Sequence, residues 1–554
     1  MENAEDPNAG WCARAVLWLI FLTLPVRLAL AAVSGLGYGE SYYMLNVLSP
    51  QLSYFDQPPL AFWLGTLSVE LCGALNALTL RLPSILCFAG ITWLMYCLGK
   101  KLFGARAGFY AALLLNLSAV FTVTTASWLQ PDAPLMLFWL ATALCLVRIF
   151  RIGGDDPETA VSADAAAEKA RIAAARAGSL KWWLLAGLLL GLTTLSKYHA
   201  AFLFAGAGLF ALTHRPSRHW LWHPGPYLAL LVNFIVSSPI FIWNAQNHWA
   251  SFLFQSARAG SGGEFSLHWD WFLGSLVGQS LWLLPWIWLP LMWLMVDAFR
   301  RGPGACSRWF CACTAVLPIV FFSVVTLWSD LGFHFHWQAP GYLMLFPLLG
   351  AEAAGWTRSA LMRHRVWTRR WLWLSAGACV LVMLVLQLHA ATGCWSKFGP
   401  AYFAGFFDEE DPTLEGFDYD ALRERFAKEG WLDDANVFAA ANRWHLGGKM
   451  GWALRGKKPV ACFDDDPRNL AFLYPQTPLL GKDAVVAVRL SPRKTAKFLD
   501  EIRNMFAEIT PLEPVKIIRG GKEEFSLQLF YCRKMLKEYA YPENYRTALG
   551  GAAE

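Results

Sequence analysis

The chain has 554 residues, of which 56% are hydrophobic and 16% are charged, and it contains 29 tryptophans. A soluble protein of this length rarely has so few charged residues, and apolar runs of about 15–25 residues, long enough to cross a hydrocarbon core of about 30 Å, fill most of residues 14–390. The net charge of +6 comes from basic loops between these runs, so it gives no support for nucleic-acid binding.

The apolar runs predict a polytopic α-helical membrane protein with about 11–13 transmembrane helices. Residues 59–78 are also apolar, but Glu70 and the neighbouring Pro and Gly residues favour a helix that lies at the interface over a further crossing, which would need a partner near 41–53. The predicted crossings are about 14–34, 81–98, 107–125, 132–150, 182–196, 199–213, 226–243, 270–296, 309–328, 337–354 and 371–390. The first is predicted to be retained, because no small-residue cleavage site follows it.

Basic residues and other polar residues occupy alternate loops between these runs. Basic loops stay in the cytoplasm, so the other loops are predicted to face outward. The basic groups include Lys100–Arg106, Arg148–Arg151, Arg300–Arg308 and Arg358–Arg370. The outward groups are 39–40, 55–59, 130–132, 197–199, 244–249 and 334–337. Ionisable side chains at that depth are costly, which makes the outward groups candidates for a functional site.

The composition becomes that of a soluble protein after residue 390. Residues 418–429 have the pattern of an amphipathic helix, and residues 459–463, 484–488 and 525–531 have that of strands. We therefore predict a transmembrane domain over 1–390 and a small α/β domain over 391–554, on the periplasmic side. The Gly-rich stretch 446–449 is predicted to be a turn, and the Ala-rich stretch 152–180 a surface helix or linker.

Three carboxylates stand in the predicted outer loops: Glu40, Asp56 and Asp132. Asp56 precedes Pro58 and Pro59, which hold its backbone extended. The alternatives to a catalytic role are an exposed loop carboxylate for Glu40, a turn cap for Asp56 and a helix cap for Asp132.

Cationic and donor groups accompany the carboxylates, and they suit a phosphate or pyrophosphate near the membrane surface. They are Lys197, His199, Arg258, His334 and His336. Lys197 is the most specific because it interrupts an apolar stretch, although a lysine near a helix end also snorkels to the headgroups. His334 and His336 with Asp330 lack any metal-ligand spacing, so we predict neither a metal site nor a cofactor. Tyr and Trp side chains in these loops, and Asn244, suit sugar stacking or an interfacial belt.

Six short motifs occur in order along the chain, and together they resemble the GT-C superfamily of polyprenyl-phosphate-dependent glycosyltransferases. The bacterial branch related to protein O-mannosyltransferases, lipid A aminoarabinose transferases and rhizobial galacturonosyltransferases is the most similar. The motifs are Glu40-Ser41-Tyr42-Tyr43, Tyr54-Phe55-Asp56-Gln57-Pro58-Pro59-Leu60, Pro131-Asp132-Ala133-Pro134-Leu135, Leu195-Ser196-Lys197-Tyr198, Trp243-Asn244 with Trp249-x-Ser251-Phe252-x-Phe254-Gln255, and His336-Trp337-x-x-Pro340-x-Tyr342.

The resemblance implies that a sugar moves from a polyprenyl-phosphate donor to a lipid, glycan or protein hydroxyl at the outer face of a bacterial inner membrane. A loop carboxylate deprotonates the acceptor, the anomeric carbon is inverted, and basic side chains stabilise the departing phosphate. The chain has Gly39 where the family has an Asp, so Glu40 is predicted to be the base and Asp56 to bind donor or acceptor, with the reverse assignment open.

A second departure is Gln57, where aminoarabinose transferases carry a lysine, and it moves the expected phosphate contacts elsewhere. The predicted donor- and acceptor-binding residues are Asp132, Lys197, Tyr198, Asn244, Arg258, His334, His336 and Trp337. Two other functions stay open, a transporter or flippase for a lipid-linked glycan and a non-catalytic envelope assembly subunit. A transporter places its polar groups near the midplane, whereas these cluster at one boundary. The sugar and the acceptor are not fixed by the sequence.

Overall fold

A computed structural model describes residues 9–153, 165–258, 260, 266–329, 336–392, 412–519 and 521–549. The chain divides into two compact units. Unit 1 comprises Met1–Ala29, Pro83–Phe241 and Gln255–Val380, and unit 2 comprises Leu30–Leu82, Ile242–Phe254 and Leu381–Glu554. This division differs from the boundary expected at residue 390, because residues 30–82 and 242–254 pack with the C-terminal region.

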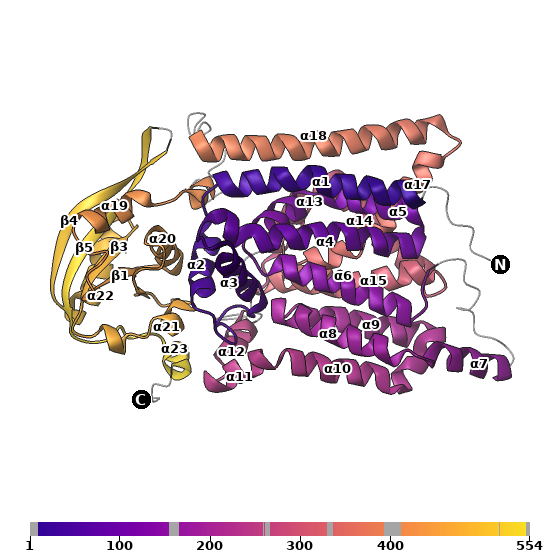
Figure 1. The fold of residues 1–554 in the computed structure, drawn as a ribbon, viewed down its shortest axis with the longest axis horizontal. Coiled ribbons are helices and arrows are strands. Elements are labelled where there is room, and N and C mark those ends of the chain that lie inside the picture. The colour runs from indigo at the N-terminus through magenta and orange to yellow at the C-terminus, as the bar shows by residue number, and fades with distance from the viewer. Residues whose placement is uncertain are drawn as a thin grey trace. The chain divides into compact units, whose positions relative to one another are not determined.

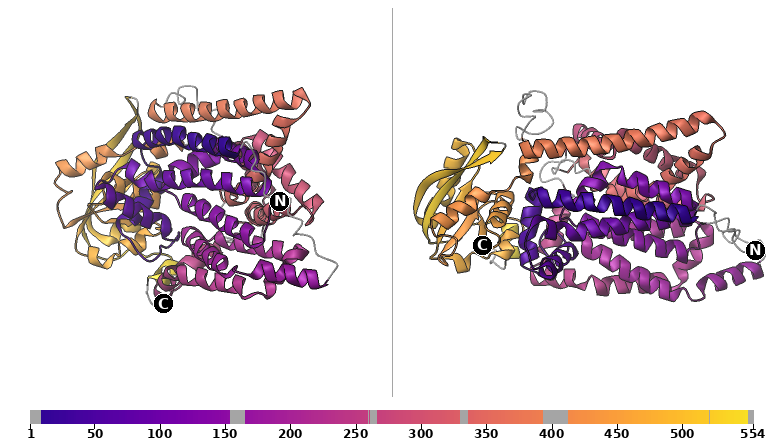
Figure 2. Two further views of the ribbon diagram at one scale, coloured as in Figure 1. Left: turned by 45° about the vertical axis from the view of Figure 1, so that its right-hand side comes forward. Right: turned by 45° about the horizontal axis from the view of Figure 1, so that its top comes forward.

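Unit 1 is a helical bundle in which α8 packs against both α6 and α10, and α5 packs against α17; Figures 1 and 2 show α6, α8 and α10 running side by side. Its helices, some of which continue into unit 2, are α1 (Ala9–Val33), α4 (Ala77–Phe103), α5 (Ala105–Asn116), α6 (Asp132–Ile149), α7 (Ala165–Arg176), α8 (Leu180–Ser196), α9 (Ala200–Thr213), α10 (Pro224–Val236), α13 (Trp269–Leu283), α14 (Pro285–Arg301), α15 (Cys306–Val324), α16 (Ala339–Leu343), α17 (Phe346–Arg358) and α18 (Met362–Thr392), with a π-helical turn at Phe121–Thr125 and 3₁₀ turns at Arg215–Trp222 and Val325–Leu327.

Five helices in the described part of the chain are long and apolar enough to cross a membrane, and three bent helix pairs also pass that test. The five are Gly10–Val33, Ala77–Phe103, Asp132–Ile149, Cys306–Leu327 and Met362–His389. The sequence predicted α8 and α9 as two short segments with a break at Lys197, and the extended backbone of Lys197 (φ −162°, ψ 145°) makes that break.

The segment 270–296, predicted as a single crossing, is not one continuous helix. Helices α13 and α14 meet there at 112°. Leu284, between them, has φ 71°, and Pro285 begins α14. A proline cannot donate the backbone hydrogen bond that would continue α13, so the chain turns sharply at this point. Apolar composition alone did not reveal the turn, because both helices are apolar.

Unit 2 holds a five-stranded mixed sheet in the order β2-β1-β3-β5-β4, in which β1 is parallel to β2 and β3, and β5 is antiparallel to β3 and β4. The strands are β1 (Val437–Ala441), β2 (Val460–Cys462), β3 (Asp483–Val488), β4 (Phe506–Arg519) and β5 (Lys522–Met535). The helices that belong to unit 2, two of which continue into unit 1, are α2 (Tyr38–Leu48), α3 (Leu60–Cys72), α11 (Ser238–Gln246), α12 (Ala250–Ala257), α19 (Asp420–Lys428), α20 (Trp444–Ala453), α21 (Leu470–Leu473), α22 (Pro492–Ile502) and α23 (Glu543–Ala548), with 3₁₀ turns at Pro412–Gly416, Thr477–Leu479 and Arg503–Met505.

The sheet has a hydrophobic core on each face. Along β1, Val437 and Ala439 join the core that contains α19 and α20, whereas Phe438 and Ala440 join the core that contains α22. Alternate side chains of a strand point to opposite faces, so this pattern requires helices on both faces. The predicted small α/β fold is confirmed, and the three predicted strands and the helix at 418–429 occur as β2, β3, β5 and α19.

The Gly-rich stretch 446–449 is not the predicted turn but the middle of helix α20. Its glycines allow α20 to pack closely against α2, since a Cβ on Gly448 would lie 2.7 Å from the backbone N of Tyr42, and one on Gly451 would lie 2.7 Å from Leu45. Close helix packing requires small residues at the contact, and two adjacent glycines in a sequence do not distinguish that role from a turn.

Candidate functional site

Asp56 lies in unit 2 in the loop between α2 and α3, where its side chain is 2% exposed. The Tyr42 hydroxyl on α2 donates a hydrogen bond to Asp56 Oδ1 at 3.1 Å. Arg468 Nη1 lies 3.8 Å from Asp56 Oδ2. A buried carboxylate needs such donors, because an unpaired charge away from water is costly. Two elements far apart in sequence therefore orient Asp56.

One partner of Asp56, Arg468, comes from the loop that follows the carboxyl end of strand β2. Ligand sites in open α/β sheets form at this edge, because loops from parallel strands meet there. The loop after β2 carries Arg468, whose backbone is left-handed (φ 52°), and Asn469. The Asn469 backbone N–H donates to the Tyr42 hydroxyl at 2.8 Å, and its Oδ1 accepts from the Phe55 backbone N–H at 3.0 Å. Asn469 thus fixes both Tyr42 and the residue before Asp56.

Burial and nearby carboxylates shift the pKa values of Tyr42 and Arg468. Burial, reinforced by the Asp56 carboxylate, raises the pKa of Tyr42 well above its ordinary value, so Tyr42 stays a proton donor at neutral pH. Burial alone would lower the pKa of Arg468, but Asp466, 2.7 Å from its Nε, and Asp56 raise that pKa overall. Arg468 is therefore a permanent cation beside Asp56.

Glu40, the predicted base, is held in a different arrangement. Arg81 Nε and Nη2 donate to its two carboxylate oxygens at 2.8 and 2.6 Å, and both side chains are buried. Glu40 Oε2 also accepts the Gly37 N–H at 3.0 Å, which caps the start of α2. Glu40 and Tyr42 are two positions apart on this helix, so their side chains leave it on opposite sides. Glu40 and Asp56 consequently belong to separate groups of contacts.

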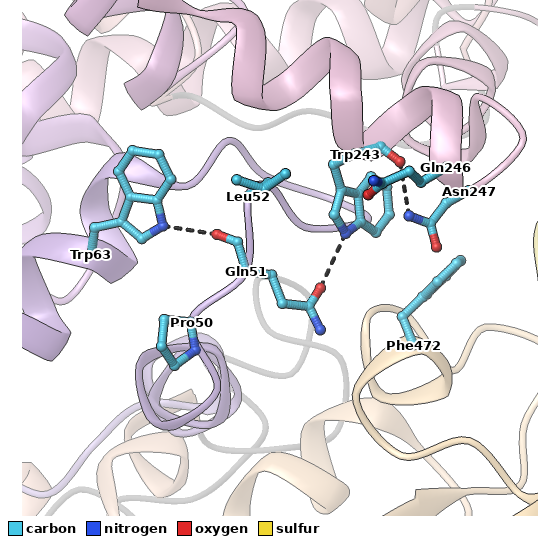
Figure 3. Close-up of a pocket in the computed structure, with 8 residues that line it drawn as sticks. All are labelled: Pro50, Gln51, Leu52, Trp63, Trp243, Gln246, Asn247 and Phe472. Carbon is cyan, nitrogen blue, oxygen red and sulfur yellow. Dashed lines mark hydrogen bonds between the residues drawn. The ribbon is translucent and has the colours of Figure 1, made fainter.

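A cavity of about 630 Å³ is formed in unit 2 by the loop that carries Asp56 and by helices α3, α11 and α21 (Figure 3). Its lining combines aromatic rings with amides: Pro50, Gln51, Leu52, Trp63, Trp243, Gln246, Asn247 and Phe472. The Trp63 indole N–H donates to the Gln51 carbonyl at 2.8 Å, and the Trp243 indole N–H donates to Gln51 Oε1 at 3.1 Å. These bonds hold two aromatic rings at the cavity wall.

Asn244 holds the turn between α11 and α12. Its backbone carbonyl accepts the Trp249 N–H at 2.7 Å, and its side-chain Oδ1 accepts the Phe252 N–H at 3.3 Å. His248 and Trp249 in this turn have left-handed backbones (φ 51° and 62°), which is uncommon for residues other than glycine. Asn244 is fully buried, so the contacts described here give it a structural role beside the cavity residue Trp243.

Asp132 and Lys197 form a buried ion pair in unit 1. Lys197 Nζ lies 3.0 and 3.1 Å from the two Asp132 oxygens, and the side chains are 9% and 4% exposed. Asp132 begins α6, and Lys197 is at the break between α8 and α9. The sequence singled out both residues, but for separate roles as helix cap and phosphate ligand. Their pairing explains how each tolerates burial.

Other predicted binding residues gather near the α8–α9 break in unit 1. The His199 ring stacks on Phe322 at 4.5 Å, and Phe322 contacts Trp337 at 5.5 Å. The Arg258 guanidinium lies 5.2 Å from the Trp337 ring centroid, and the His336 ring centroid lies 6.3 Å from the Trp337 ring centroid. Tyr198 is half-buried beside Lys197. His334 lies outside the described residues, and among those described no group of three His, Cys, Asp or Glu is placed to hold a metal.

Sequence reasoning missed Arg81, Arg468, Asn469 and Lys449. Arg81 could have been found as a single charge in an apolar helix, which requires a partner. Arg468 and Asn469 follow the acidic run Asp464–Asp466 directly after a predicted strand, and that position is a weak signal for a site. No sequence signal linked this loop to Asp56, because the contact joins residues more than 400 positions apart.

Comparisons with known proteins agree with this architecture. Residues 56–154 and 162–243 match the family model described as dolichyl-phosphate-mannose-protein mannosyltransferase. The crystal structure of ArnT from Cupriavidus metallidurans in the apo state has a TM-score of 0.54 with 16% identity, and that of ArnT bound to undecaprenyl phosphate has a TM-score of 0.55 with 17% identity. Both alignments cover 94% of this chain and 98% of ArnT. No curated protein matches the chain.

The chain has the fold of ArnT. This fold and the family-model match agree with the resemblance drawn from the six motifs, and the prediction of a polytopic helical fold with a small C-terminal sheet domain is confirmed. The family-model match begins at Asp56 and includes both Asp132 and Lys197. Asp56, Asp132 and Lys197 thus lie within the matched segments, whereas Glu40, Arg258, His334 and His336 lie outside them.

Proposed function

We propose that this chain is a glycosyltransferase that moves a sugar from a polyprenyl-phosphate carrier to a hydroxyl group of a lipid, glycan or protein. The reaction takes place at the outer face of a bacterial inner membrane, with unit 2's sheet domain in the periplasm. The fold, the family model and the chemistry of the two groups of residues support this function. The observation that carries it is a buried carboxylate, Asp56, on the same loop that lines an aromatic and amide cavity.

Asp56 is the proposed general base, in place of Glu40. Both Glu40 oxygens are engaged by Arg81 and one also by the start of α2, so proton uptake there would break a buried ion pair. Asp56 accepts a hydrogen bond from the neutral Tyr42 hydroxyl, and Arg468 Nη1 approaches it at 3.8 Å. A carboxylate positioned in this way accepts a proton as the bond to the sugar forms.

The proposed reaction is a single displacement at the anomeric carbon of the sugar. The acceptor oxygen attacks the anomeric carbon while its proton passes to Asp56. The bond between that carbon and the phosphate oxygen breaks, and the electron pair leaves with the polyprenyl phosphate. Attack opposite to the leaving group inverts the anomeric carbon. Positive charge near the leaving phosphate lowers the barrier. Within unit 1, we propose that Lys197, Arg258 and His336 bind a phosphate group, with Asp132 orienting Lys197.

The cavity of unit 2 is the proposed binding place for a sugar. Sugars present C–H faces to aromatic rings and hydroxyl edges to amides, and the cavity supplies both kinds of partner. The loop that lines it also carries Asp56, five residues after Gln51. The lining has no charged residue, so we expect a neutral part of the substrate in this position.

The decisive experiment measures sugar transfer by the purified full-length chain in vesicles that contain a polyprenyl-phosphate sugar. Mass spectrometry of envelope glycolipids and glycans from a strain that lacks the chain identifies the sugar and acceptor to supply. We expect Asp56→Asn to lower the transfer rate by at least about 100-fold, the usual range for loss of a general base, with an unchanged melting temperature.

A matched control is Asp483→Asn. Like Asp56, Asp483 accepts a hydrogen bond from a tyrosine hydroxyl, that of Tyr531, at 2.7 Å. Asp483 lies on strand β3 and does not line the cavity. We expect D483N to transfer sugar at close to the wild-type rate. Transfer by D56N at the wild-type rate would remove Asp56 as the base. If the chain moved the carrier across the bilayer without transferring any sugar, the proposed function would be that of a transporter and not that of an enzyme.

A further inference from the structure

A second cavity, of about 480 Å³, lies in unit 1 between α5, the end of α17 and the first half of α18. Two arginines, Arg365 and Arg369, line it together with Tyr110 and a set of apolar side chains. Within the described part of the chain neither guanidinium has a hydrogen-bond or ion-pair partner. Two unpaired cations at one cavity predict an anionic ligand.

The apolar lining continues from the arginines along the same face of α18. Positions 365, 369, 372 and 376 all line the cavity, and their spacing of four, three and four residues places them on one helical face. From Arg365 to Ala376 the helix rises by about 16 Å, about half of a hydrocarbon core of roughly 30 Å. The cavity therefore offers a charged end and an apolar track as long as one leaflet.

The position of the arginines along the span suits the membrane surface. Helix α18 is long and apolar enough to cross a membrane, and only 11% of its most apolar window is buried inside the protein. Arg363, Arg365, Arg369 and Arg370 all lie near its first turns, and clusters of basic residues at a helix end are retained on the cytoplasmic side. Leu113 and Leu117 on α5 add apolar contacts opposite.

We propose that this cavity binds one anionic phospholipid of the cytoplasmic leaflet. Its phosphate would lie at Arg365 and Arg369, and an acyl chain would follow Leu113, Leu117, Leu372 and Trp373. A soluble phosphate would gain nothing from that apolar track, and a zwitterionic lipid would bring a positively charged ammonium group close to the two arginines. Basic pockets at the cytoplasmic ends of transmembrane helices recognise anionic headgroups through this combination. The site is independent of the proposed sugar transfer.

The test uses the full-length chain reconstituted in nanodiscs of phosphatidylethanolamine with or without phosphatidylglycerol, followed by native mass spectrometry of the retained lipid. We expect wild-type protein to retain phosphatidylglycerol in preference to phosphatidylethanolamine. R365Q/R369Q should weaken that retention by about 30-fold, given roughly 1 kcal/mol for each basic residue near an anionic lipid. Ala376→Phe, which fills the apolar end and keeps both charges, should weaken retention as well.

The matched control is R363Q/R370Q, which removes the same charge from the same part of α18 at positions that do not line the cavity. We expect it to keep the preference for phosphatidylglycerol. If R363Q/R370Q lost the same amount of phosphatidylglycerol retention, the effect would come from general surface charge, and the proposed lipid site would be overturned. Displacement by inorganic phosphate would overturn the assignment to a lipid, and preferential displacement by polyprenyl monophosphate would overturn the assignment to a glycerophospholipid.

Discussion

Arg81 and Glu40 form a buried ion pair that ties helix α4 to the start of α2. Besides its two bonds to Glu40, Arg81 donates to the backbone carbonyls of Ala31, Ser34 and Gly35 at 2.7–3.1 Å. The guanidinium thus holds the end of α1 and the segment that follows it through their carbonyl groups, and the Glu40 carboxylate balances the charge of Arg81. The pair explains why a carboxylate is needed at position 40 without any catalytic role.

We predict that Glu40→Gln lowers the free energy of unfolding by about 3–5 kcal/mol, because it leaves Arg81 buried without its counter-charge. The double variant E40L/R81M should recover much of that loss, since it removes both charges together. Thermal unfolding in detergent, followed by tryptophan fluorescence, measures both effects. An E40Q protein with wild-type melting temperature and abolished sugar transfer would instead assign the base to Glu40.

The aromatic wall of the unit 2 cavity gives a prediction about substrate affinity. Trp63 is half-buried and bonds to Gln51 through its indole N–H, so its ring faces are the part that a sugar would contact. We expect Trp63→Leu to raise the KM for the sugar substrate about tenfold with little change in kcat, corresponding to about 1.4 kcal/mol. Trp63→Phe, which retains a ring, should raise it less than threefold. Equal KM values for W63L and wild type would contradict sugar binding at this wall.

The contact of α20 with α2 predicts different outcomes for two neighbouring glycines. A Cβ at position 448 would lie 2.7 Å from the backbone N of Tyr42, whereas one at 447 would lie 2.8 Å from the flexible end of Leu470. We expect Gly448→Ala to destabilise the protein by about 1–3 kcal/mol and to slow transfer, because the helix carrying Tyr42 must shift. Gly447→Ala should have a small effect on both. The same melting temperature for G448A and wild type would refute the close packing.

The Asp132–Lys197 pair gives a prediction for unit 1. Lys197→Met should lower the melting temperature, since it leaves the Asp132 carboxylate buried without its cation. In D132N/K197M we expect most of the stability to return but not the affinity for the donor phosphate, if Lys197 binds that phosphate. Donor KM values for the double variant and for wild type separate the two roles. Equal values would confine the pair to a structural role.

How much the sequence predicts depends on whether a pattern is local. Charge alternation and apolar length predicted the membrane fold, and strand periodicity predicted β2, β3 and β5. The strand at Val437–Ala441 has no alternation, because it is buried on both faces, and the turn at Leu284 lies inside continuous apolar sequence. Asp56, Asp132 and Lys197 were found as costly charges. Arg468 and the pairing of Glu40 with Arg81 were not found, because long-range contacts create them.

Lys449 on α20 makes the stability of unit 2 depend on pH. Its ammonium donates to the Leu36 carbonyl and to the Phe417 carbonyl, the latter at 2.8 Å. Burial lowers the pKa of Lys449 from 10.5 to about 8, although Asp418 and Glu40 oppose this shift. Between pH 8 and 10.5 the unfolded chain therefore binds more protons than the folded chain, so the contribution of Lys449 to stability rises with pH over that window.

The shift from 10.5 to about 8 corresponds to a cost of about 3 kcal/mol that is fully present below pH 8 and absent above 10.5. We predict that Lys449→Met removes this pH dependence between 8 and 10.5, while it leaves two carbonyl groups without their donor and so lowers stability at high pH. Denaturant unfolding of wild type and K449M at a series of pH values measures both slopes. Parallel curves for the two proteins over this window would show that Lys449 keeps an ordinary pKa in the folded state.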